Sequence, residues 1–214
     1  MTKENNELNL RAKGRLWIVA APSGGGKTSL VEAAIDKMDK IIRSVSFTTR
    51  TKRVGEIDGK DYVFVDKAAF EQLIRDKAML EYENVFGNYY GTSLAFIENH
   101  LHKGIDVVLT IDWQGSRRVR EKMPASKGIF ILPNKLSVLE ERLKNRGQDD
   151  AKIIAARMAQ AKEQASHYDE FDYLIINDNF DRALLQMLAI FSADRLLRER
   201  QAVNHARLIQ NLLK

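Results

Sequence analysis

The sequence predicts an α/β protein whose core is a mostly parallel sheet flanked by helices. Three observations support this. Short apolar runs alternate with segments whose apolar residues recur at helical spacing along most of the chain. The stretch Leu16–Leu30 places an apolar strand, a glycine-rich loop, Lys27-Thr28 and a helical pattern in that order. Residues 45–92 switch to strands of period two, which indicates a subdomain inserted into the core.

The stretch LWIVAAPSGGGKTSL has the order of features that a phosphate-binding loop requires. Glycines allow positive φ and let backbone N–H groups approach an anion, and the helix that opens at Lys27 adds the positive end of its dipole. In this motif the lysine reaches the β- and γ-phosphates and the Thr28 hydroxyl ligates Mg²⁺. The motif would have glycine at position 21, where this chain has Ala21. The alternative is a glycine-rich turn that binds nothing.

Composition limits the classes of function. A chain of 214 residues allows one domain, or one core with insertions. It has no cysteine, which excludes disulfides, thiolate metal sites and cysteine nucleophiles and fits a reducing cytosol. The polar N-terminus lacks the apolar region of a secretory signal, and runs such as Val107–Ile111 are too short to span a bilayer. We therefore expect a cytoplasmic protein with no membrane partner.

The net charge is +5, from 34 Lys and Arg residues against 29 Asp and Glu residues. Such an excess is typical of nucleic-acid binding, and equally of a site built for nucleotide phosphates. Composition alone does not choose between them.

The first half of the chain contains a polar tail over residues 1–13, then the strand, loop and helix above, and then the insertion. Within the insertion we expect strands at Ser44–Thr48, Tyr62–Val65, Met79–Phe86 and Asn88–Gly91, and a helix at Lys67–Lys77. A basic loop, residues 48–53, follows the first of these strands.

The second half of the chain returns to alternating helices and strands. Expected strands are Asp106–Ile111, Gly128–Leu132 and Tyr173–Ile176. The first expected helix, Ser93–Lys103, is ended by Gly104, and the second runs through Val119 and Met123 and stops before Pro124. A third is marked by Leu136, Leu139 and Leu143 and stops at Gly147, and a fourth is capped by Asp149 and Asp150, with Ile154, Met158, Ala161 and Ala165 inward. A helix or helix pair is expected after Asn179. The four histidines, His100, His102, His167 and His205, have no convincing ligand partners.

Two sets of charged residues could serve the phosphate loop. Asp112 ends a strand, where the second acid of a phosphate-loop enzyme meets the metal or its water shell, but it could instead cap the helix that starts at Trp113. Arg142 and Arg146 lie one helical turn apart, and Arg157 comes from the next helix. Arginines stabilise the charge of a transferring phosphoryl group, whereas the alternative is a solvated basic face.

The inserted region carries a third set of polar residues: Ser46, Arg50, Arg53, Tyr62, Glu81, Tyr90 and Thr92. Two arginines and two phenols could hold a second phosphate. Glu81 lies in the apolar-aromatic context MLEYENVF, and a carboxylate there can accept from N1–H and N2–H₂ of guanine, whereas adenine would be repelled. The alternative is a surface glutamate on a half-exposed strand.

The motifs APSGGGKTSL, SVSFTTRTKRVGEIDGKDYVFV, LEYENVFGNYYGTS, IDWQG, IFILP, ERLKNRGQDD and LIINDNF occur in this order. With them the chain closely resembles the guanylate kinases, especially the bacterial form, over residues 14 to about 200. These enzymes pass a phosphoryl group from ATP to GMP, so the resemblance implies ATP and GMP (and dGMP) as substrates, Mg²⁺ as cofactor and a cytoplasmic enzyme of purine metabolism.

The resemblance also implies roles for residues at matching positions. ATP would be bound by Ala21, Pro22, Ser23, Gly24, Gly25, Gly26, Lys27, Thr28 and Asn177, and Mg²⁺ by Thr28 and, through water, Asp112. Guanine would be bound by Ser46, Glu81 and Thr92, and the GMP phosphate by Arg50, Arg53, Tyr62 and Tyr90. Catalytic residues would be Lys27, Arg50, Arg142, Arg146 and Arg157.

The implied architecture is a phosphate-loop kinase core, an inserted GMP-binding subdomain and a helical lid. The core takes residues 14–44, 93–137 and 167–214, the last with a C-terminal helical segment, while the GMP-binding subdomain takes 45–92 and the lid 138–166. Three positions depart from the family pattern: Thr110 replaces an Asp, Asn179 replaces an acid, and Thr51-Lys52 replaces a pair that ends in proline.

Rival functions are a peptide-binding scaffold of the same fold, and a kinase with another phosphate acceptor. Intact Lys27 and Thr28 argue against the scaffold, and Ser46 with Glu81 argues against the other acceptor. We expect no nucleic-acid partner, because the arginines map to two phosphate sites and not to one contiguous basic face. A homo-oligomer through the C-terminal segment is possible.

Overall fold

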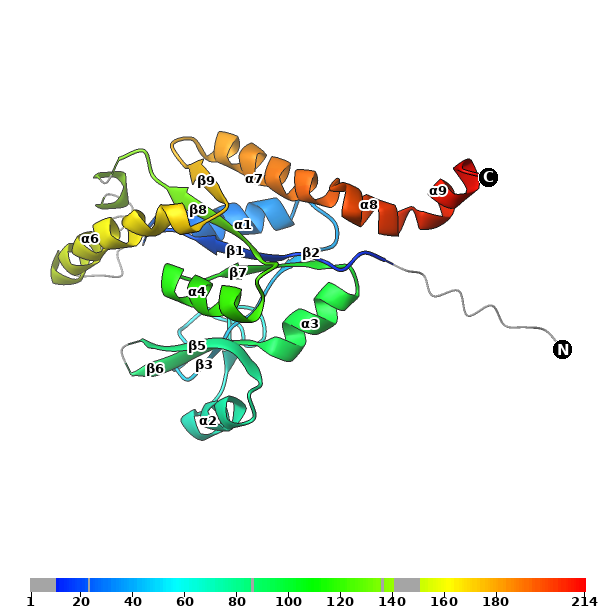
Figure 1. Ribbon diagram of the computed structural model, residues 1–214. Helices are drawn as coiled ribbons and strands as arrows, with labels where there is room; N and C mark the ends of the chain where they lie inside the picture. The colour runs from blue at the N-terminus through cyan, green and yellow to red at the C-terminus, as the bar shows by residue number, and fades with distance from the viewer. Residues whose placement is uncertain (1–10, 23, 86, 136, 141–150) are drawn as a thin grey trace.

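A computed structural model describes residues 11–22, 24–85, 87–135, 137–140 and 151–214, with the backbone alone for 151–157. Within these residues the chain forms two sheets, a five-stranded one and a four-stranded one (Figure 1). None of the described helices combines the length and apolar character needed to cross a membrane.

The larger sheet is parallel throughout, as the sequence predicts. Its strands are β1 (Leu16–Ala20), β2 (Ile41–Arg43), β7 (Asp106–Thr110), β8 (Lys127–Leu132) and β9 (Tyr173–Ile176). They lie in the order β2-β7-β1-β8-β9, and each neighbouring pair is parallel. All five strands therefore end at one edge of the sheet, where a ligand site is expected.

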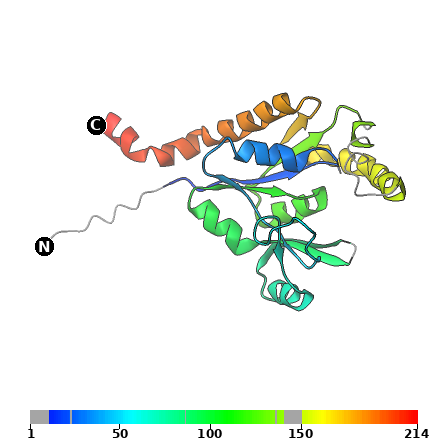
Figure 2. The same cartoon turned by 180° about the vertical axis from the view of Figure 1, so that it is seen from behind.

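Helices cover both faces of this sheet (Figures 1 and 2). One face carries α1 (Lys27–Ile35) and α7 (Phe180–Arg195), and the other carries α3 (Leu94–His102) and α4 (Trp113–Lys122). Side chains of a strand alternate between faces, so Trp17 and Val19 pack into the α1/α7 core while Leu16 and Ile18 pack into the α3/α4 core. Burial on both faces explains why β1 is apolar throughout.

The smaller sheet is built from the inserted segment between β2 and α3. Its strands β3 (Phe47–Thr48), β4 (Val63–Phe64), β5 (Met79–Val85) and β6 (Asn88–Ser93) lie in the order β4-β3-β6-β5. Helix α2 (Lys67–Arg75) packs on it through Phe70, whose fully buried ring stacks on Tyr89 with 5.1 Å between centroids.

The remaining helices extend the molecule in two directions. Helix α6 (Ala151–Ser166) and a 3₁₀ turn, η1 (His167–Glu170), lie at the end of the core where the strands of the large sheet finish. Helices α8 (Arg198–Asn204) and α9 (Ala206–Leu212) continue from α7 past the opposite end (Figure 1).

The strands differ from the sequence prediction in two places. The strand expected at Ser44–Thr48 covers only Phe47–Thr48, because the Ser44 N–H still bonds the Val108 carbonyl of the large sheet (3.0 Å) before the chain crosses to the small one. Strand β2 was not predicted at all. It has three residues and follows a turn at Lys40 with φ 55°, too short a run to show a period.

The helix expected from Leu136 to Gly147 is described only at residues 137–140, which are helical. Leu136, Leu143, Gly147 and the expected caps Asp149 and Asp150 lie outside the described residues.

Candidate active site

The glycine-rich loop joins the end of β1 to the start of α1. Gly24 and Gly26 have φ of 82° and 86°, in the left-handed region that side chains disfavour. A Cβ on Gly25 would lie 2.9 Å from the Ala21 Cβ and 3.0 Å from the Pro22 carbonyl oxygen. All three glycines are thus required by local geometry; Ser23 lies outside the described residues.

Lys27 starts α1 and reaches across to the end of β7, where its Nζ donates to the Ile111 carbonyl at 3.2 Å. It lines a cavity of about 240 Å³ together with Ala20, Ala21, Asp112, Trp113, Phe130 and Gln164. Burial lowers the pKa of Lys27 to about 8, and the nearby Asp112 carboxylate acts in the opposite direction. The Lys27 ammonium therefore lies beside the cavity and is partly desolvated.

Asp112 is the N-cap of α4. Its Oδ1 accepts a hydrogen bond from the Gly115 N–H at 2.7 Å, so the capping alternative is correct for one carboxylate oxygen. Thr28, on α1, is exposed. No group of three or more His, Cys, Asp or Glu side chains that could hold a metal occurs in the described part of the chain.

Asn177, at the end of β9, lies behind the loop. Its side chain is buried (2% exposed residue) and donates from Nδ2 to the Gly25 carbonyl at 3.1 Å, while its backbone N–H donates to the Leu132 carbonyl at 2.7 Å. The residue thus links the edge of the sheet to the backbone of the loop.

Glu81 and Thr92 face each other across β5 and β6. Thr92 Oγ1 donates to Glu81 Oε1 at 2.8 Å, and Glu81 is only 6% exposed. Burial raises the pKa of Glu81, whereas the hydrogen bond from Thr92 and the charge of Arg118 lower it. The negative charge of Asp112 raises it further.

Arg50, Tyr62 and Tyr90 gather a short way from Glu81 on the same subdomain. The Arg50 guanidinium lies 5.4 Å from the Tyr62 ring centre, and the Tyr62 and Tyr90 rings are 5.9 Å apart. Burial raises the pKa of Tyr62, so its phenol stays protonated and can donate.

The structure adds Glu56 to this cluster. Arg50 donates to Glu56 Oε1 at 2.6 Å, and Glu56 Oε2 accepts from the Arg53 N–H at 2.7 Å. The signal for it in the sequence is a single acid closing a basic loop, which the sequence reasoning overlooked. Two further residues were expected in this region. Ser46 is half-buried, and its carbonyl accepts from the Val63 N–H, while the Arg53 side chain is exposed.

The three arginines expected from the lid give less information. Arg142 and Arg146 lie outside the described residues, and Arg157 lies on α6 with its side chain undescribed. The end of α6 is nevertheless joined to the site.

The His167 ring stacks on Trp113, the residue after Asp112, with centroids 3.5 Å apart. The Arg117 guanidinium lies 4.6 Å from the Trp113 ring, and the same arginine forms an ion pair with Glu170. His167 is thus more than an ordinary polar position. The only sign in the sequence of this contact between α4 and η1 was Trp113 in the motif IDWQG.

The described residues form two neighbouring sites. One offers backbone N–H groups, the positive end of α1 and the Lys27 ammonium, which together suit a polyphosphate. The other offers an arginine and two phenols for a phosphate, and a buried carboxylate for a partner with adjacent N–H donors. The cavity beside Lys27 and Asp112 belongs to the first of these sites.

Comparisons with known proteins agree with this arrangement. A family model described as guanylate kinase matches residues 13–194. The chain is similar to curated guanylate kinases of Vibrio vulnificus strain YJ016 and Histophilus somni strain 129Pt, at 54% identity in each case over 94% of this chain and 98% of the relative. It is also similar to the crystal structure of guanylate kinase from Anaplasma phagocytophilum, with a TM-score of 0.71 and 32% identity over 89% of this chain and 91% of that one.

Proposed function

This chain belongs to the guanylate kinase family and transfers a phosphoryl group from ATP to GMP, and we propose that its two neighbouring sites divide between these nucleotides. The observation that carries the division is the buried Glu81, held by Thr92 in the small sheet, whereas the phosphate loop follows β1 of the large sheet.

ATP is assigned to the phosphate loop. Backbone N–H groups from Gly24 to Thr28 hold its phosphates, Lys27 reaches the β- and γ-phosphates, and Asn177 keeps the Gly25 backbone in place. This assignment explains why a lysine is kept in a position that desolvates it: bound phosphate oxygens replace the lost water.

Mg²⁺ is assigned to Thr28 and, through water, Asp112. Mg²⁺ usually takes one or two protein oxygens and fills its octahedron with substrate phosphates and water, so a hydroxyl and a single carboxylate oxygen left outside the helix cap fit it. When bound, the ion would neutralise charge on the β- and γ-phosphates.

GMP is assigned to the small sheet. Glu81 accepts from N1–H and N2–H₂ of guanine, with Ser46 and Thr92 beside it, while Arg50, Arg53, Tyr62 and Tyr90 hold the phosphate. The GMP phosphate replaces Glu56 on Arg50. We expect dGMP to react as well, because none of these residues is assigned to the sugar.

Transfer then needs positioning and charge stabilisation, without a covalent enzyme intermediate. A phosphate oxygen of GMP attacks the γ-phosphorus in line, a P–O bond forms, and the bond to the β-phosphate oxygen breaks to leave ADP. Residues 138–166 act as a lid on the core (14–44, 93–137, 167–214) and the GMP-binding subdomain (45–92). Its closure brings Arg142, Arg146 and Arg157 to the phosphoryl group and excludes water. The absence of cysteine fits work in the cytosol.

The assignment is tested by measuring ADP release with ATP, Mg²⁺ and a panel of GMP, dGMP, AMP, UMP and CMP. We expect GMP and dGMP to be turned over, and AMP to be at least about 10⁴-fold poorer in kcat/KM because its N1 lone pair faces the Glu81 carboxylate. Equal turnover of AMP or UMP would remove the guanine assignment. No turnover of any acceptor by a folded protein would favour the scaffold alternative.

The lowered pKa of Lys27 predicts a pH effect on ATP use. The free enzyme has Lys27 charged below its pKa of about 8 and neutral above it, so kcat/KM for ATP should fall tenfold per pH unit above about pH 8. The measurement is a pH profile of kcat/KM for ATP from pH 6 to 10 at saturating GMP. Lys27→Arg is the matched control, since arginine stays charged and should remove this limb. A flat wild-type profile up to pH 10 would contradict the prediction.

A further inference from the structure

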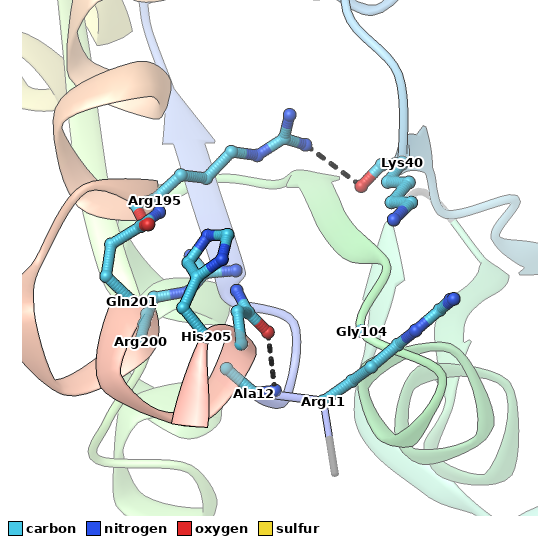
Figure 3. Close-up of a pocket in the computed structure, with 9 residues that line it drawn as sticks. Arg11, Ala12, Lys40, Gly104, Arg195, Arg200, Gln201 and His205 are labelled. Atoms are coloured by element: carbon cyan, nitrogen blue, oxygen red, sulfur yellow. Dashed lines mark hydrogen bonds between the residues drawn. The ribbon is translucent and has the colours of Figure 1, made fainter. Parts of the chain in front are cut away.

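A second concave site lies at the far end of the large sheet from the phosphate loop, where β1, β2 and β7 begin. It is a cavity of about 470 Å³, within the range of sites that hold small molecules. Figure 3 shows its two walls. Arg195, Arg200 and His205, from α7, α8 and the turn after α8, lie on one side, and Lys40 and Arg11 lie on the other.

The lining of this cavity is basic. Among the described residues, three arginines, a lysine and a histidine line it and no acidic residue does. In the described part of the chain, the side chains of Arg11 and Lys40 have no ion pair. The exposed Glu199 pairs instead with Arg15 at 3.8 Å and does not line the cavity.

Two buried carboxylates behind the wall hold its arginines in place. Arg195 Nε and Arg200 Nη2 donate to the two oxygens of Asp106, each at 2.9 Å, and Arg200 also pairs with Asp194. Asp194 is shared with Arg15, at 3.0 Å. Because Glu199 also pairs with Arg15, three guanidinium groups face three carboxylates, and the positive charge of the cavity comes from Arg11 and Lys40.

The arginine wall is rigid. Arg195 donates to the Asp39 and Lys40 carbonyls at 2.8 and 3.0 Å, and the second contact crosses the cavity mouth (Figure 3). The Arg200 side chain is only 11% exposed, and its Nε has no hydrogen-bond partner among the described residues. A ligand meeting these groups pays little side-chain entropy, because they are already held in place.

These features match a compact anion with several charges. The Arg11 guanidinium can bind phosphate oxygens in pairs, and with the Lys40 ammonium it supplies two positive charges, more than one carboxylate would balance. A single phosphate would fill only part of the cavity. We propose that this cavity binds a small molecule carrying a di- or triphosphate group, at a site separate from the ATP and GMP sites.

The test is calorimetric titration with the catalytic sites blocked. The full chain is saturated with a bisubstrate analogue in which adenosine and guanosine are joined by five phosphates, and is then titrated with tripolyphosphate and, separately, with ATP at fixed ionic strength. We expect one further equivalent of each to bind. If ATP binds more tightly than tripolyphosphate, the nucleoside adds contacts, and if the two bind equally, only the phosphates are recognised. Either result supports the proposal.

The decisive variant is Arg11→Gln with Lys40→Asn, because asparagine tolerates the positive φ of Lys40. It should weaken tripolyphosphate binding at least about tenfold, since two charge-assisted contacts are lost. The matched control, Lys37→Asn with Lys103→Gln, removes the same charge from exposed neighbours that do not line the cavity, and should bind like wild type.

Absence of a further equivalent in the wild type would overturn the proposal, as would equal weakening in both variants. Because the analogue's own titration reports on the ATP and GMP sites, failure here is distinguishable from failure of the proposed function.

Discussion

Lys27→Ala should lower kcat by about 10³-fold, the usual cost of removing one preorganised charge from a transition state. Among the described residues that line the cavity beside the phosphate loop and Asp112, Lys27 is the only cation. ATP would keep its backbone contacts with the loop, so KM for ATP should change less than kcat. The measurement is steady-state ADP release at saturating GMP.

The stability of the same variant should move differently. The pKa of Lys27 is lowered from 10.5 to about 8 on folding, so the charge that Lys27 still carries near pH 7 destabilises the folded chain. Wild-type stability should therefore rise between about pH 8 and 10.5, and Lys27→Ala should unfold at the wild-type temperature or above it at pH 7. Lys37→Ala, an exposed lysine just past α1, is the control and should be fully active. Near-normal turnover by folded Lys27→Ala would refute the role given to this lysine.

Glu81→Gln should lower kcat/KM for GMP by about 10- to 100-fold. The amide keeps the volume of the side chain and can still accept from Thr92, but its NH₂ group faces guanine donors where a carboxylate oxygen had accepted. Selectivity for GMP over AMP should fall with it, because the charge that repels N1 of adenine is gone. Kinetics with both acceptors measure this.

The control for this substitution is Glu71→Gln, the same chemical change on α2, where the glutamate is paired only with Lys67 at 3.8 Å. It should leave GMP kinetics and selectivity unchanged. If Glu81→Gln kept the wild-type kcat/KM for GMP, this result would refute the guanine contact proposed for Glu81.

Much of the fold follows from local pattern. Strands buried on both faces, such as β1 and β7, are apolar runs of the right length, and β9 begins and ends where the pattern places it. Capping chemistry located the ends of α3, since Ser93 accepts from the Phe96 N–H and Gly104 has φ 73°.

Contacts between distant segments were not predictable in the same way. The Asn177 amide meets Gly25 from 152 residues away, and only family resemblance pointed to that position. Glu56 reaches Arg50 through a loop that has no period, and the stacking of His167 on Trp113 depends on how α6 docks. Each of these depends on tertiary geometry, which hydrophobic periodicity does not encode.

The N-cap of helix α1 is Gly26, a residue with no side chain to cap it. Its first N–H groups are therefore left to phosphate, and the substrate takes the place of a capping side chain. At this residue, a change that raises the stability of the unliganded protein is therefore expected to lower its affinity for phosphate. A side chain that capped α1 would stabilise the unliganded protein but occupy the N–H groups that bind phosphate, so Gly26 suits phosphate binding better than a capping serine or aspartate would.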